Sequence, residues 1–79
     1  MNLMPRYFFD IRDSDGTATD EVGMELSDLQ AAEIEAAQSL ADLTKNMAPD
    51  DERHDVEIAV RTDKGPLFKA AFVYQLTRH

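Results

Sequence analysis

The sequence has 79 residues, enough for one small domain, and its 43% apolar and 30% charged residues are typical of a folded chain rather than a disordered one. Its 16 acidic and 8 basic residues give a net charge of −8, which opposes attraction to nucleic acids and to anionic membranes. The lack of cysteine excludes disulfides, thiolate zinc sites and a cysteine nucleophile, and it favours a reducing, cytoplasmic setting.

The chain is expected to form a single domain over residues 1–79, with residues 1–4 as a loose N-terminal extension. No segment approaches the ~18 consecutive apolar residues of a membrane span, so we expect no membrane partner.

The first predicted element is a strand over residues 6–12, preceded by Pro5 at a position where a missing N–H does little harm. Its residues alternate with a period of two, which is typical of a half-buried strand. The more apolar set is expected to face the core and consists of Tyr7, Phe9 and Ile11. The other face carries Arg6, Phe8, Asp10 and Arg12.

A turn follows at residues 13–16, where the pair Asp15-Gly16 suits a tight hairpin. Residues 17–26 then predict a weaker second strand. Gly23 interrupts this strand and indicates a bulge or a break. Met24 and Leu26 are its best candidates for core positions.

A helix is predicted to begin at Ser27, which with Gln30 fits a capping box. Pro49 requires the helix to end by about Ala48. Ile34 and Ala41 lie on a flank of this helix. Apolar residues at spacings of three and four form one stripe that must be buried, namely Leu29, Ala32, Ala36, Leu40, Leu43 and Met47.

Two further strands are predicted in the last third of the chain. The first covers residues 56–61, and residues 63–65 form a hairpin turn in which Gly65 can adopt a left-handed conformation. The second covers residues 68–76 and is the longest and most apolar, so we expect it at the centre of the sheet.

Together the elements predict a two-layer α+β domain in the order β-β-α-β-β. A four-stranded, mainly antiparallel sheet carries the helix on one face. The sequence leaves the strand order open.

The patterns that would indicate chemistry are absent. Counted from Asp13, the glycine and glutamate positions of a calcium-binding EF-hand loop are occupied by Ala18 and Met24. His54 and His79 are too few for a zinc site, and the three isolated glycines make no phosphate-binding loop. The serines at positions 14, 27 and 39 lack the setting of a nucleophile. We therefore expect no catalytic, cofactor-binding or metal site, and no enzyme activity.

The sheet face opposite the helix is the candidate interaction face. It has three interpretations: an ordinary solvated surface, a protein or homodimer interface around Phe8 and Val73, or a platform for stacking single-stranded nucleic acid on Phe8. The net charge places nucleic acid below protein as the expected partner. The residues assigned to this face are Arg6, Phe8, Arg12, Arg61, Lys69, Val73 and Gln75.

Two segments resemble a known family. The opening M-P-R-Y-F-F-D-I-R-D and the segment D-E-x-G-x-E-L-x-D-L at residues 20–29 are similar to those of short, uncharacterised bacterial proteins, abundant in rhizobia and other alphaproteobacteria. The similarity extends over residues 4–76 and implies a bacterial, cytoplasmic protein with no assigned activity or site residues. A looser similarity, at fold level only, is to antitoxin domains of the HicB type.

The sequence thus favours a non-catalytic protein-interaction module that binds an unknown protein or a second copy of itself. The alternative is a nucleic-acid-binding or regulatory, antitoxin-like module that uses the same open sheet face.

Overall fold

The computed structural model describes residues 4–13, 15–45, 53–75 and 77. Expectations for the N-terminal extension before Met4, for Ser14, Met47, Leu76 and His79, and for the end of the helix before Pro49 lie outside these residues. The elements in chain order are β1 (Arg6–Asp13), β2 (Gly16–Ala18), β3 (Met24–Glu25), α1 (Leu29–Lys45), β4 (Arg53–Thr62) and β5 (Gly65–Gln75).

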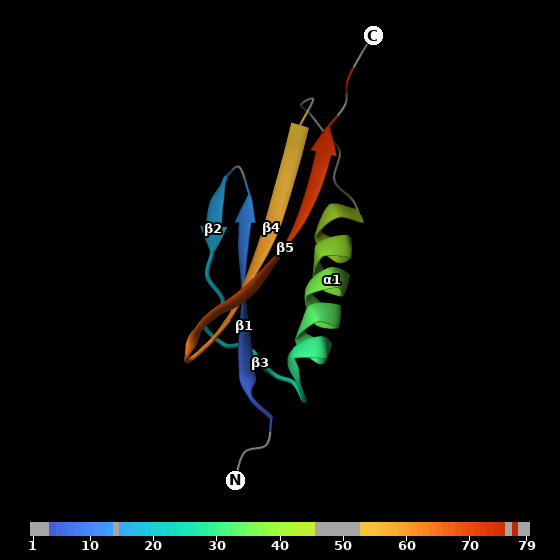
Figure 1. The fold of residues 1–79 in the computed structure, drawn as a ribbon. Helices are drawn as coiled ribbons and strands as arrows, with labels where there is room; N and C mark the ends of the chain where they lie inside the picture. Colours follow the sequence, from blue (N-terminus) through green and yellow to red (C-terminus); the bar gives the residue numbers. More distant parts are fainter. Residues whose placement is uncertain (1–3, 14, 46–52, 76, 78–79) are drawn as a thin grey trace.

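The strands form an antiparallel sheet in the order β2-β1-β4-β5, with the short β3 also paired to β1. Helix α1 covers one face and runs beside β4 and β5 (Figure 1). The predicted α+β fold with one helix on one face is therefore confirmed. The number of strands differs slightly, because the predicted second strand is divided in two.

The division falls where the sequence indicated it, at Gly23. Strand β2 pairs with the end of β1, Asp13 opposite Gly16, and β3 pairs with its beginning, Tyr7 opposite Met24. Between them the chain leaves the ladder, and Gly23 has a φ of +77°, which only glycine adopts readily. Leu26 packs against the core as predicted, whereas Met24 is 42% exposed because it lies at the edge of the sheet.

The position predicted for the last strand is wrong. β5 is the longest strand, with 11 residues, but among the described strands it lies at the edge of the sheet and pairs only with β4. The chain crosses from β3 through α1 before β4 begins, so β4 takes the place beside β1 and β5 returns along its outer side (Figure 1). Length and apolar character therefore did not indicate a central strand here.

The helix begins one residue later than the capping box requires. Asp28, rather than Ser27, caps it, because the Asp28 Oδ1 accepts a hydrogen bond of 2.8 Å from the N–H of Ala31. With Leu29 as the first helical residue, Gln30 stands one position too early to complete a capping box.

Within the described residues, no helix combines the length and apolar character needed to cross a membrane.

The core lies between the middle of α1 and the sheet. Ala32 and Ala36 are fully buried, which lets the helix backbone approach the sheet closely. Leu29 and Leu43, at the ends of the predicted stripe, are 48% and 40% exposed, so the stripe is buried only in its centre. The sheet supplies Tyr7, Val56, Ile58 and Val60 as buried residues, and Phe9, Ile11, Phe68 and Ala70 pack against this cluster.

Candidate functional site

The register of the sheet brings the predicted interaction face together. Phe8 lies opposite Arg61 and Arg12 opposite Glu57 across β1 and β4, while Ala59 lies opposite Lys69 across β4 and β5. Paired residues share a face, and alternation along β1 and β5 adds Arg6 and Val73. The side chain of Gln75 lies outside the described part of the structure.

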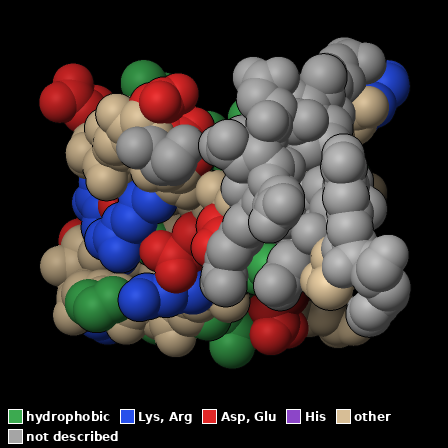
Figure 2. Space-filling model, turned by 90° about the horizontal axis from the view of Figure 1, so that it is seen from above, with side chains coloured by type: hydrophobic (Ala, Val, Ile, Leu, Met, Phe, Trp, Pro, Cys, Tyr) green, Lys and Arg blue, Asp and Glu red, His purple; other side chains and the backbone are tan. Residues whose placement is uncertain are grey.

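The charges of this face are balanced within the face itself. Arg6 pairs with Glu25 at 3.0 Å and Arg12 with Glu57 at 3.4 Å. The ammonium group of Lys69 lies 3.9 Å from the carboxylate of Glu57. Viewed from above the molecule, basic side chains lie directly beside acidic ones (Figure 2). Exposed pairs of this kind add little stability, but they leave a face on which basic and acidic side chains alternate.

Phe8 is half-buried rather than an exposed aromatic. The Arg61 guanidinium lies over its ring, 4.6 Å from the ring centre, in a cation–π contact. The backbone of Gly23 also approaches the ring so closely that a β-carbon there would lie 2.9 Å from the Phe8 ring and 2.8 Å from Arg6. The ring is therefore held inside a local cluster and is not presented for stacking.

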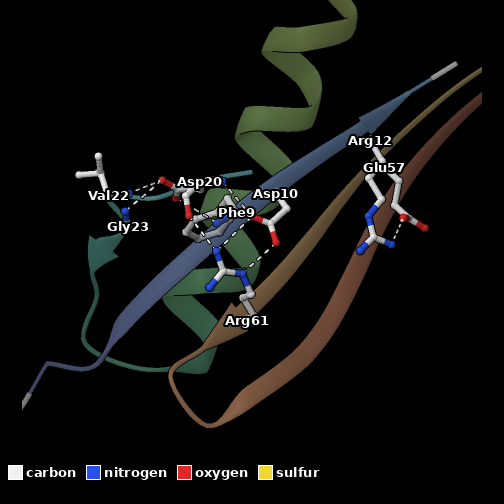
Figure 3. Close-up of polar contacts among 8 residues, drawn as sticks. All are labelled: Phe9, Asp10, Arg12, Asp20, Val22, Gly23, Glu57 and Arg61. Carbon is white, nitrogen blue, oxygen red and sulfur yellow. Dashed lines mark hydrogen bonds and ion pairs between the residues drawn. The ribbon is translucent and has the colours of Figure 1, made fainter. Parts of the chain in front are cut away.

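Arg61 extends from β4 across β1 and donates hydrogen bonds to two groups. Its Nε donates to Asp10 Oδ2 at 2.9 Å, and its Nη2 donates to the backbone carbonyl of Asp20 at 2.8 Å (Figure 3). Asp10, only 8% exposed, also accepts the N–H of Asp20 at 2.9 Å. A central carboxylate, a guanidinium and the loop between β2 and β3 thus form one hydrogen-bonded unit.

Between β2 and β3, the carboxylate of Asp20 provides the hydrogen-bond acceptor that a neighbouring strand would otherwise offer to β1. Its Oδ2 accepts the N–H of Phe9 at 3.1 Å, and its Oδ1 accepts the N–H groups of Val22 and Gly23, each at 3.0 Å (Figure 3). Without this carboxylate, the N–H of Phe9 would face the gap between β2 and β3. Together β2, Asp20 and β3 close the outer edge of β1.

Both carboxylates are held in their ionised form. The hydrogen bond from Arg61 is the largest influence on Asp10 and lowers its pKa below the ordinary 3.8, although burial acts in the opposite direction. Burial is the largest single influence on Asp20 and acts to raise its pKa. The N–H groups of Gly23, Phe9 and Val22 outweigh it together, so the pKa of Asp20 is also lowered.

Sequence reasoning missed the roles of Asp10 and Asp20. Asp10 was placed on the correct face without a partner, because Arg61 lies 51 residues away along the chain. For Asp20 a local signal existed, since an aspartate whose carboxylate accepts the N–H groups two and three residues later is the pattern of an Asx turn.

A shallow depression of about 260 Å³ lies on the open face where β4 meets β5. Its floor is apolar and its rim is charged, which suits a partner's side chain better than a buried small molecule. The residues around it are Asp10, Arg12, Ala59, Val60, Arg61, Pro66, Leu67, Phe68 and Lys69. In the described part of the chain, no three His, Asp or Glu side chains gather to hold a metal ion.

Apart from Met24 on β3, the exposed large apolar side chains of the described strands lie on β5. Leu67, Phe72 and Val73 are 49%, 36% and 54% exposed, and β5 has a neighbouring strand on one side only among the described residues. Of the predicted interaction face, Lys69, Val73 and Gln75 lie on this strand. The sheet therefore has one edge that is closed by hydrogen bonds and one that is open.

Comparison with family models identifies the chain. Residues 6–73 match the model described as Domain of unknown function (DUF6894), and the chain belongs to this family. Comparison with curated proteins and with solved structures gives no significant match.

Proposed function

We propose that this member of the family is a protein-interaction module without catalytic activity, and that its partner adds a strand along β5. The observation that carries the proposal is the open edge of this 11-residue strand. Unpaired N–H and C=O groups of an edge strand are a template for another chain, and adjoining apolar side chains provide specificity. Phe72 and Val73 supply such side chains on the two faces of β5.

The contacts of the other residues of the predicted interaction face support β5 as the interaction surface. Arg6, Arg12 and Arg61 are each engaged by a carboxylate, and the Arg61 guanidinium lies over the ring of Phe8. The nucleic-acid alternative has less support, because stacking of a base needs a free ring face. The lack of cysteine supports a cytoplasmic setting for the module.

The non-catalytic part of the proposal is supported by the state of the carboxylates. Asp10 and Asp20 are engaged by Arg61 and by backbone N–H groups, which leaves them in structural roles. A general acid or base needs a group that can exchange a proton with a substrate near neutral pH. The lowered pKa values of both groups oppose that role.

Photo-cross-linking in the cells that make the protein tests the proposal. A photoreactive residue is placed at Val73 on β5 and, as a control, at Ile34 on the helix, which is similarly exposed at 52%. We expect a cross-linked protein from position 73 that is absent from position 34 and that is identified by mass spectrometry. Identical products from the two positions, or none from position 73, would show that β5 is not an interaction surface.

A further inference from the structure

The two edges of the sheet differ in how far their backbone groups are paired by other described residues. The edge of β1 is occupied along its length by β2, by the Asp20 carboxylate and by β3. Nothing among the described residues pairs with the outer side of β5. A long bare edge is normally protected in natural proteins, so the unprotected part of β5 is informative.

The protection of β5 is limited to its first half. Pro66 has no N–H to offer, and Lys69 adds a charge. A bulge lies between them, because Val60 pairs with Phe68 while the next residue of β4 pairs with Pro66. Residues 70–75 contain no proline, glycine, charge or register shift. Only this second half can accept a straight, regular strand.

We infer that the strand that β5 accepts is the β5 of a second copy, paired antiparallel with Phe72 of one copy opposite Phe72 of the other. The inference rests on the proposed function and names its partner. A strand that pairs with itself about a two-fold axis forms a closed interface, which is the commonest arrangement of homo-oligomers. The assembly is a dimer with one continuous sheet.

The composition of the strand favours self-pairing. Residues 70–75 carry no charge, so two identical segments meet without placing like charges opposite each other. The net charge of −8 belongs to other parts of the chain, where salt screens it over about 10 Å at 0.1 M. Pairing also covers the exposed large apolar side chains of Phe72 and Val73.

The register follows from the limits of the regular segment. With Phe72 at the two-fold axis, Val73 lies opposite Ala71, Lys69 lies opposite Gln75, and Ala70 lies opposite Tyr74, so that positions of the helix side meet positions of the helix side. Both helices then lie on the same face of the joined sheet. An axis at Lys69 would place two ammonium groups together, and an axis at Ala70 would bring Pro66 and the bulge into the ladder.

Analytical ultracentrifugation of the full chain tests the dimer. We expect a reversible dimer at concentrations up to about 100 μM that tightens as salt is added, because the two acidic copies repel each other. Val73→Lys is expected to weaken it by about tenfold or more, since it puts a charge beside the axis. Ile34→Lys, with the same charge change and similar exposure, is the matched control and should leave the dimer intact.

Because the chain has no cysteine, single-cysteine variants test the register directly. Phe72→Cys should form an intermolecular disulfide, since residues directly opposite have β-carbons about 5 Å apart. Ala71→Cys and Val73→Cys each lie about 8 Å from their equivalents, beyond disulfide reach. Cross-linking fastest at position 71 or 73 would overturn the register, and circular dichroism verifies that each variant is folded.

The outcomes separate this inference from the proposed function. A wild-type chain that stays monomeric at high salt, or a dimer that Val73→Lys does not weaken, overturns the β5–β5 dimer. If the photoreactive residue at Val73 then captures a different protein, the interaction function stands with another partner. If it captures none, both fail.

Discussion

Replacing Asp20 with alanine tests whether one carboxylate closes the edge of β1. The substitution removes the acceptor of three backbone N–H groups, those of Phe9, Val22 and Gly23. It leaves the backbone carbonyl of Asp20 in place, so that Arg61 keeps this hydrogen bond. The expected effect is a loss of stability with no loss of core side chains.

The three bonds contribute unequally. The N–H of Val22 is exposed and can bond to water instead, so its loss costs little. The N–H groups of Phe9 and Gly23 are partly buried, and each such donor left without an acceptor costs about 1–3 kcal/mol. Together they predict a loss of about 3 kcal/mol. For a chain of this length, total stability is of the order of 4–12 kcal/mol, so the fraction lost is large.

Urea unfolding followed by circular dichroism measures this loss of stability. In thermal unfolding, the Tm should fall by about 10–20 °C. Asp13→Ala is the matched control, because Asp13 also accepts a backbone N–H, that of Asp15 at 2.8 Å, but in an exposed turn. We expect the control to lose less than about 1 kcal/mol. Equal stability of the two variants would refute the role assigned to Asp20.

Three further predictions concern the same cluster. Because the pKa values of Asp10 and Asp20 are lowered in the folded protein, the unfolded chain binds protons more readily than the folded one. The two carboxylates therefore stabilise the fold fully well above pH 3.8, and this stabilisation declines as the pH falls through the lowered pKa values of the folded state. Urea unfolding midpoints measured over a series of acid pH values test this. Gly23→Ala should lose about 2 kcal/mol or more in urea unfolding, because the left-handed conformation and the close ring contact both oppose a β-carbon; a neutral result would contradict the packing described. Arg61→Lys should lose about 1–2 kcal/mol because an ammonium cannot reproduce the forked contacts, whereas Arg12→Lys, at an exposed pair, should change stability by less than about 0.5 kcal/mol.

The cluster also explains the two segments that mark the family resemblance. Arg6 from the opening segment pairs with Glu25 from the second, and the N–H of Leu26 donates to the carbonyl of Pro5 at 3.1 Å. Asp10 and Asp20, one from each segment, are joined by a hydrogen bond. The residues of the two segments that make these contacts have structural roles, and these roles account for the distinctive sequence pattern.

The sequence by itself determined the main elements and the buried sides of β1 and of the middle of α1. Alternation placed Tyr7, Phe9 and Ile11 toward the core, and the alanines of α1 marked the side of the helix that is buried. These are local properties, because the direction of a side chain on a strand or helix follows from the period of the backbone. The break at Gly23 was likewise visible locally.

Only the tertiary structure decided which strands are neighbours and which charges meet. β5 became an edge strand because the crossover through α1 put β4 beside β1, a choice that periodicity does not encode. The pairing of Arg61 with Asp10 joins residues 51 positions apart and gives a basic residue of the interaction face a carboxylate partner. Such contacts depend on strand order and register, and these are fixed by how the whole chain buries its apolar surface.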